Sequence, residues 1–138
     1  MIRQLEEKDW STVKEWLFEI GRNSFDNFVP SFLEKKLEGE RRDFPERFVV
    51  SEDDELNGVL WFEANPERKS VFIHAIYVPQ KYRGAGVSDQ LIDYLEEYCK
   101  ERSITTIDLN VTTNLEAAIK FYKRRGFQVK RYQMSKGL

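Results

Sequence analysis

The chain has 138 residues, of which 41% are hydrophobic and 14% aromatic, and its formal net charge is −2. This length predicts one globular domain, residues 1–138, and argues against a second catalytic domain. The longest apolar run, residues 71–78, is too short for a membrane helix, so we expect no membrane partner. The single cysteine excludes an intramolecular disulfide and a multi-cysteine zinc site. This cysteine content agrees with a reducing compartment, and we therefore expect a cytoplasmic protein.

Two helices are predicted ahead of the main sheet. After a short strand at residues 1–5, apolar residues recur at helical spacing from Trp10 until Gly21. A second short helix is predicted from Pro30 to Gly39.

The remaining elements alternate between strand and helix. Two strand-like runs flank an Asp/Glu/Asn turn and predict a hairpin. The next run, residues 70–78, is apolar on both faces, which is typical of a central strand covered on each side, and predicts the middle of the sheet. The later elements are a helix, a strand, a helix and a terminal strand, at 87–102, 105–111, 115–125 and from Phe127 onward. This order predicts a mixed α/β layer fold.

A glycine-containing turn, Arg83-Gly84-Ala85-Gly86, follows the apolar strand and opens the next helix. The first backbone N–H groups of a helix have no partner within it, so they favour an anion at the amino terminus. Glycine permits close approach of a ligand, and Arg83 adds a permanent positive charge suited to phosphate. The turn therefore predicts a phosphate site; the alternative is a strand-to-helix turn with no ligand.

Two other phosphate-binding motifs fit this turn poorly. A Walker loop would end in Gly-Lys-Ser/Thr, but Gly86 is followed by Val87 and Ser88. A dinucleotide fingerprint needs a third glycine where Asp89 stands, and a carboxylate there repels an anion.

A second block, NLEAAIKFYKRRGF at residues 114–127, places an Asn at the start of a helix and Gly126 just after its end. Together with IYVPQKYRGAGVSDQLI, this block resembles the GNAT superfamily of acetyl-CoA-dependent N-acetyltransferases. The first stretch is similar to that family's Arg/Gln-x-x-Gly-x-Gly/Ala pyrophosphate loop. The two blocks cover residues 71–127 at the family's spacing.

The resemblance implies a fold, an activity and a coenzyme. The fold would be a GNAT-like mixed sheet of about six to seven strands with helices on both faces. The protein would be an acyltransferase that moves an acetyl group directly from acetyl-CoA to a primary amine, with acetyl-CoA as co-substrate and no metal. The implied coenzyme-binding residues are Ile76, Tyr77, Val78, Arg83, Gly84, Ala85, Gly86, Val87, Ser88, Asn114 and Tyr122.

The resemblance also implies roles within this site. The backbone of residues 76–78 would lie along the pantetheine arm, which Asn114 would also contact, and Tyr122 would protonate the departing thiolate. The backbone N–H of Ile76 would stabilise the oxyanion. The alternative for Tyr122 is a half-buried core aromatic. Ser88 stands where the family has Gly or Ala, so its hydroxyl either binds phosphate or its bulk weakens binding.

Two residues are candidates for the catalytic base. His74, the only histidine, precedes Ile76 by two positions, so strict alternation predicts that it shares a face with Ile76 and Val78. Glu63, at the end of the preceding strand, is the rival base. The alternatives are a core histidine hydrogen-bonded to backbone and an ordinary solvated carboxylate.

Charge is distributed unevenly along the chain. Residues 1–63 contain 16 acidic and nine basic residues, whereas residues 117–138 contain seven basic residues and no acidic one. These ends form either two solvated surfaces or two sites for ligands of opposite charge. In similar proteins the two early helices and their loop, residues 21–30, form the wall of the acceptor site, and an acidic wall suits a small cationic amine.

Other functions stay open. A protein or peptide amine is an alternative acceptor, although Asn110 stands where the branch that acetylates protein amino termini has a glutamate. A non-catalytic acyl-CoA-binding regulatory module is an alternative of a different class. The negative net charge disfavours a nucleic-acid partner, and the sequence is compatible with a homodimer.

Overall fold

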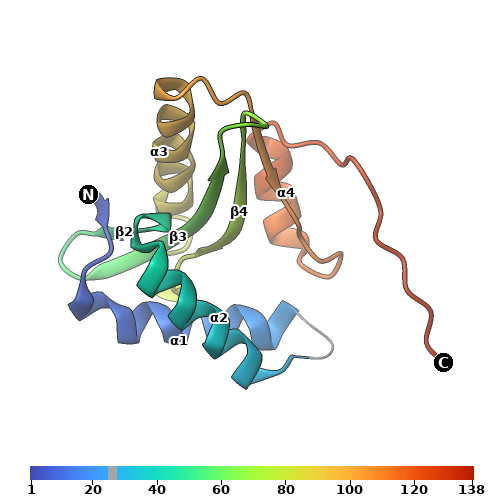
Figure 1. Cartoon of the computed structure of the whole chain (residues 1–138), viewed down its shortest axis with the longest axis horizontal. Helices are drawn as coiled ribbons and strands as arrows, with labels where there is room; N and C mark the ends of the chain where they lie inside the picture. The colour runs from blue at the N-terminus through green and yellow to red at the C-terminus, as the bar shows by residue number, and fades with distance from the viewer. Residues whose placement is uncertain (25–27) are drawn as a thin grey trace.

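The computed structural model describes residues 1–24 and 28–138, and within them the chain forms a sheet flanked by helices (Figure 1). The strands are β1 (Ile2–Gln4), β2 (Phe48–Glu52), β3 (Leu56–Asn65), β4 (Ser70–Tyr77) and β5 (Thr106–Leu109). The α-helices are α1 (Trp10–Ser24), α2 (Pro30–Asp43), α3 (Val87–Glu101) and α4 (Glu116–Arg124). Short 3-10 turns precede α1, β2 and α3, at Glu7–Asp9, Pro45–Arg47 and Gln80–Tyr82.

The strands lie in the order β1-β2-β3-β4-β5, and all neighbours are antiparallel except β4 and β5, which are parallel. This confirms the mixed α/β fold and the β2–β3 hairpin. The sheet of the described residues has five strands, fewer than expected, and β3 rather than β4 is in the middle.

The predicted terminal strand from Phe127 is wrong for the described chain. Residues 128–138 are exposed and form no ladder there, and the large apolar side chains of Val129 and Met134 reach no core. Lys130 and Arg131 interrupt the alternation of this segment, which leaves it without the apolar face that a strand buries against a neighbouring layer.

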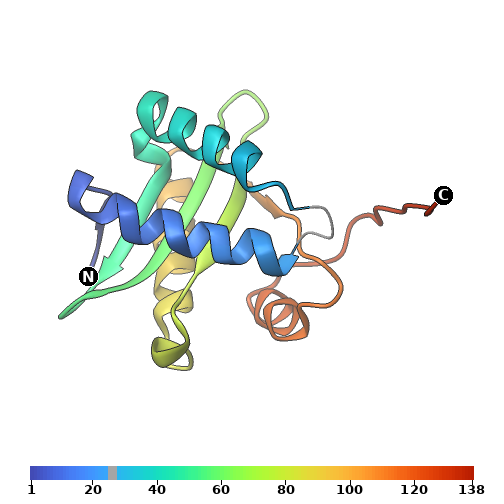
Figure 2. The same cartoon turned by 90° about the horizontal axis from the view of Figure 1, so that it is seen from below.

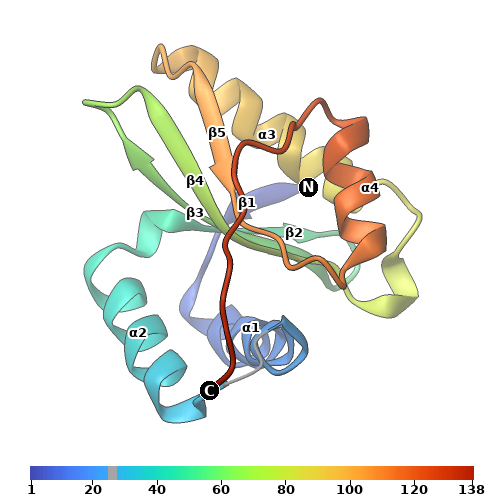
Figure 3. The ribbon, with the colours of Figure 1, turned by 90° about the vertical axis from the view of Figure 1, so that its right-hand side faces the viewer.

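Helices cover both faces of the sheet, as predicted. Figure 3 shows α1 and α2 on one side and α3 and α4 on the other, and Figure 2 shows α1 and α2 crossing the strands. Each face has its own apolar core: Leu91 and Leu95 pack with the α3 side, and Val13 and Leu37 with the α1 and α2 side. None of the helices in the described ranges is long and apolar enough to cross a bilayer.

The first helix continues past Gly21, contrary to prediction, and is described through Ser24. A Cβ at Gly21 would come within 2.5 Å of the ring of Phe28, so glycine admits a close contact here rather than ending the helix. Of the predicted acceptor-side loop, residues 25–27 lie outside the described part of the chain.

Strands β4 and β5 pair over only four residues and then part. Their last pair is Ile73 with Leu109, whereas β4 continues along β3 until Tyr77 lies opposite Val59. Within the described chain, residues 74–77 therefore have a strand partner on one side only. An open strand edge of this kind offers unpaired backbone N–H and C=O groups to a ligand.

A β-bulge in β4 lies where the two strands part. Trp61 lies opposite Ala75 and its neighbour Phe62 lies opposite Ile73, so His74 is an extra residue on β4. Bulges turn side chains toward new directions and are frequent beside active sites.

The bulge makes the prediction for the face of His74 wrong. Ile76 and Val78 pack into the core on the α3 side, as alternation requires for those two residues. The ring of His74 instead stacks on Trp61, 4.5 Å between centroids, and Trp61 belongs to the core under α1 and α2. Strict alternation fails because the extra residue shifts the pleat by one position.

Candidate active site

The turn before α3 forms the wall of a cavity of about 300 Å³. Two glycines have left-handed backbone angles there, Gly84 with φ of 84° and Gly86 with φ of 86°, which other residues rarely adopt. Six predicted residues line the cavity: Val78, Arg83, Gly84, Gly86, Val87 and Ser88. The cavity thus lies at the amino terminus of α3, where unpaired N–H groups favour an anion.

The side chain of Arg83 braces its own loop. Its Nε donates to the carbonyl oxygen of Val78 at 2.9 Å and its Nη1 to the side chain of Gln80 at 2.9 Å. The guanidinium is therefore held beside the cavity by one backbone and one side-chain acceptor. Ala85, also predicted to bind the coenzyme, is exposed.

Helix α4 contributes the opposite side of the cavity through Phe121 and Arg124, and Asp89 lines it from the first turn of α3. Arg124 and Arg125 both bind Asp89, and this pairing lowers the pKa of the Asp89 carboxyl. Asp89 is thus a carboxylate whose charge is balanced by arginines from α4.

The predicted pantetheine strand has the open edge described above. Ile76 and Tyr77 are in the unpaired stretch of β4, and Val78 follows it into the cavity. A chain running from the cavity along β4 would therefore meet free backbone groups before it reached the bulge at His74.

Tyr122 and Asn114 lie outside the cavity lining among the described residues. Tyr122 packs edge-on between Phe121 and Phe127, with centroids 5.3 and 5.5 Å away, and burial raises its pKa to about 12. The phenol is therefore fully protonated at neutral pH. Asn114 is exposed in the turn before α4.

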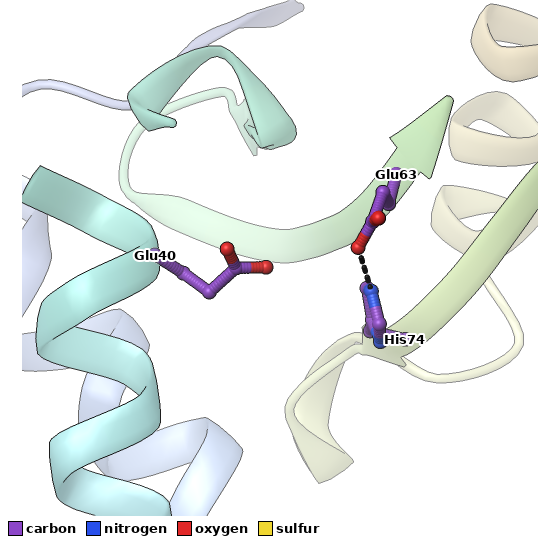
Figure 4. Close-up of side chains that lie close together, drawn as sticks. All are labelled: Glu40, Glu63 and His74. Carbon is purple, nitrogen blue, oxygen red and sulfur yellow. Dashed lines mark hydrogen bonds and ion pairs between the residues drawn. The ribbon is translucent and has the colours of Figure 1, made fainter. Parts of the chain in front are cut away.

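The two base candidates contact each other across β3 and β4 (Figure 4). His74 Nε2 lies 3.1 Å from Glu63 Oε1. The hydrogen bond from His74 lowers the pKa of Glu63, while burial lowers the pKa of His74 below 6.5. A carboxylate only accepts, so the neutral imidazole carries its proton on Nε2 and keeps a free lone pair on Nδ1.

A second ion pair supports this contact from the helical side. Arg47 Nη1 lies 2.7 Å from Glu40 and 3.4 Å from Glu63. Glu40, Glu63 and His74 have ligand atoms within 4.8 Å of one another, a spacing that could hold a metal ion. Because the Arg47 guanidinium already binds both carboxylates, it supplies the positive charge there, and we assign this group no metal chemistry.

Tyr77 connects the end of β4 to α1. Its hydroxyl donates to Glu19, its ring stacks on Trp16 at 5.4 Å, and burial together with Glu19 raises its pKa to about 12. Neighbouring carboxylates on α1 and α2 have cationic partners: Arg22 binds Glu15, and Lys14 binds two glutamates of α2. Glu19 has only the Tyr77 phenol among the recorded contacts of the described chain.

Sequence reasoning missed Glu19, Glu40 and Arg47. Glu19 contacts Tyr77, which is 58 residues away, and Arg47 contacts Glu63 on β3. Glu40 binds Arg47 and is connected to Glu63 through it. The helical spacing of Glu19 three residues after Trp16 indicates a shared face, but the partner on β4 is visible only in the fold.

Comparison with known proteins gives a family match over most of the chain. The model of the acetyltransferase (GNAT) family matches residues 2–127. An uncharacterized N-acetyltransferase of Methanocaldococcus jannaschii is 37% identical over 70 residues, which are 51% of this chain and 31% of that protein. The uncharacterized N-acetyltransferase YycN of Bacillus subtilis is 31% identical over 86 residues, 61% of this chain and 55% of the relative. The chain thus spans about a third and about half of the lengths of these two relatives.

Solved structures share the fold. An acetyltransferase of the GNAT family from Staphylococcus aureus superposes with a TM-score of 0.81 at 20% identity, over 95% of this chain and 86% of that one. Ribosomal-protein-alanine N-acetyltransferase from Brucella melitensis gives 0.70 at 22% identity, over 93% and 84%. With the family model matched from residue 2 to residue 127, the chain belongs to the acetyltransferase (GNAT) family.

Proposed function

We propose that residues 1–138 act as one N-acetyltransferase domain that moves an acetyl group from acetyl-CoA to a primary amine. The observation that carries this proposal is the cavity at the amino terminus of α3, next to the open edge of β4. A cytoplasmic location stays a prediction from the sequence.

The residues present suit the two chemically different parts of the coenzyme. The cavity offers helix N–H groups, a braced arginine and the Ser88 hydroxyl to a pyrophosphate. Glycine at positions 84 and 86 leaves open space where a Cβ would point. The free backbone groups of residues 74–77 match the amides of a pantetheine arm, which can hydrogen-bond like an added strand.

The reaction needs a neutral amine, a donor for the oxyanion and a proton for the thiolate. We assign His74 as the base: its neutral ring accepts the ammonium proton at Nδ1, directly or through a water, while Glu63 stabilises the resulting imidazolium. The amine nitrogen then bonds to the thioester carbon, and the oxyanion receives the Ile76 N–H. When the carbon–sulfur bond breaks, Tyr122 gives its proton to the thiolate.

Glu63 takes a supporting part in this assignment rather than that of the base. Its charge is already engaged by His74 and Arg47, and its lowered pKa makes it the weaker base. A lone pair on His74 Nδ1 is the stronger acceptor of a proton near neutral pH.

A small cationic amine is the acceptor that we propose. Glu19 supports this choice, because it is a part-buried carboxylate at the end of β4 whose recorded partner is a phenol. The other acidic residues of positions 1–63 support a cationic acceptor less than the composition suggested, because most of their carboxylates already have cationic partners.

A thiol-release screen of amines, diamines and amino-terminal peptides with acetyl-CoA tests the proposal. Turnover with cationic amines supports it. Turnover with peptides alone would move the acceptor to protein amino groups, and acetyl-CoA binding without turnover for any acceptor would favour a regulatory module.

A further inference from the structure

The two neighbouring arginines at the end of α4 have different surroundings. Arg125 binds Asp89, Asp93 and Glu96 along one side of α3, at 3.2, 2.7 and 2.8 Å, and its side chain is only 18% exposed. Arg125 thus holds α4 against α3 through three carboxylates. Arg124 has a single recorded ion-pair partner, Asp89, and its side chain is 60% exposed.

Arg124 nevertheless lines the cavity at the amino terminus of α3. Its Nη2 lies 3.2 Å from Asp89 Oδ1 and 3.1 Å from Oδ2, so the carboxylate holds the guanidinium at the cavity wall. Arg124 belongs to the basic end of the chain, residues 117–138, whose charges form either a solvated surface or a ligand site, and in the fold Arg124 lines the cavity.

Asp89 itself is unfavourable for an anionic ligand. It is in the first turn of α3, where a carboxylate and a phosphate compete for the same helix N–H groups and repel each other. Removing Arg124 from Asp89 does not strip this carboxylate of its charge partner, because Arg125 remains bound to it. Arg124 can therefore exchange partners without leaving a bare charge beside the cavity.

We propose that Arg124 is a pyrophosphate-binding residue that exchanges Asp89 for a phosphate oxygen when acetyl-CoA binds, and that Asp89 holds it ready while competing with the ligand. This inference rests on the proposed coenzyme site. Arginine suits the role because its planar donors can bind a carboxylate and a phosphate with the same geometry.

Calorimetry with CoA on the whole chain tests the exchange with four variants. Arg124→Gln should raise Kd by about 10-fold or more, the usual scale for losing a hydrogen bond to a charged group. Arg124→Lys should fall between it and wild type, because lysine keeps the charge but not the fork. Asp89→Asn should lower Kd, because it removes the carboxylate that competes with the ligand. The control is Lys123→Gln, which removes an exposed charge on the same helix outside the cavity lining, and its Kd should stay within about twofold of wild type.

Two further measurements, at varied salt and with a truncated ligand, test whether Arg124 binds the pyrophosphate through its charge. The affinity of Arg124→Gln should fall less steeply with salt than that of wild type, because one attractive charge is missing. The loss should persist with 3′-dephospho-CoA, which keeps the pyrophosphate. A loss that vanishes with this ligand, or an Arg124→Gln variant that binds like Lys123→Gln, overturns the inference. Failure of wild type to bind CoA would instead defeat the proposed function.

Discussion

Because Glu63 and His74 form a pair, the variant Glu63→Gln directly tests whether His74 is the base. The amide keeps the size of the side chain but removes the negative charge 3.1 Å from His74 Nε2. Glu63 raises the pKa of His74 against the effect of burial, so its neutralisation should lower that pKa further. The acidic limb of kcat/KM, where His74 becomes protonated, should therefore move to lower pH.

The expected size of the effect follows from the exposure of the pair. A hydrogen bond to a charged partner contributes about 1.5–3 kcal/mol, and screening at a glutamate that is 42% exposed reduces it to about 1.4 kcal/mol, a factor of about ten in base strength. Because a proton-transfer rate follows only part of a change in base strength, kcat/KM on the plateau should fall about threefold to tenfold.

His74→Gln provides the contrast. It removes the base itself, so kcat/KM should fall by about 10² or more and the limb should disappear. The assay is thiol release across pH with an acceptor from the screen. The reverse pattern, with the limb lost and a loss of about 10² in Glu63→Gln but the limb intact in His74→Gln, would make Glu63 the base and refute our assignment.

Four further predictions concern the loop, the acid, the acceptor and stability. Gly86→Glu should abolish CoA binding in calorimetry, because it forces a side chain and a negative charge onto a left-handed position at the helix end; unchanged affinity would contradict the site. Tyr122→Phe should lower turnover by about 10² or more with little change in CoA affinity, whereas an equally active variant would make this residue a packing aromatic. Glu19→Gln should raise KM for cationic amines and weaken its salt dependence, while Glu15→Gln, which alters an exposed glutamate paired with an arginine, should not. Because burial lowers the pKa of His74, the unfolded chain binds a proton that the folded chain does not, so stability is full above 6.5 and declines as pH falls through that value. As the pH is lowered through 6.5, the melting temperature of His74→Gln should therefore fall less than that of wild type.

The elements and the glycine turn before α3 were the predictable part of this protein. Helical spacing around Val13 and Leu17 and the glycine turn at Gly84 and Gly86 are local signals, and the structure has the corresponding helix and cavity. The helix ends were less predictable, because Gly21 was a stop signal by rule but a packing position in the fold.

The surroundings of the proposed base could not be read in advance. Alternation gives the face of a strand residue only while pairing is regular, and the bulge at His74 arises from the pairing of β4 with β3. The contact of Arg47 with Glu40 and Glu63 depends on the docking of α2 beside β3, which sequence spacing does not encode. These contacts between distant segments were therefore found only in the fold.

The bulge in β4 also makes this strand tolerant of two kinds of genetic change. Replacing His74 alters one side chain and leaves the pleat of its neighbours in place. Deleting His74 would restore regular pairing, because Ile73 already lies opposite Phe62 and Ala75 opposite Trp61, so Ile76 would stay on the α3 side and Tyr77 on the α1 side. Variants with a substitution or a deletion at position 74 should therefore both fold with both cores in place, although each lacks the proposed base.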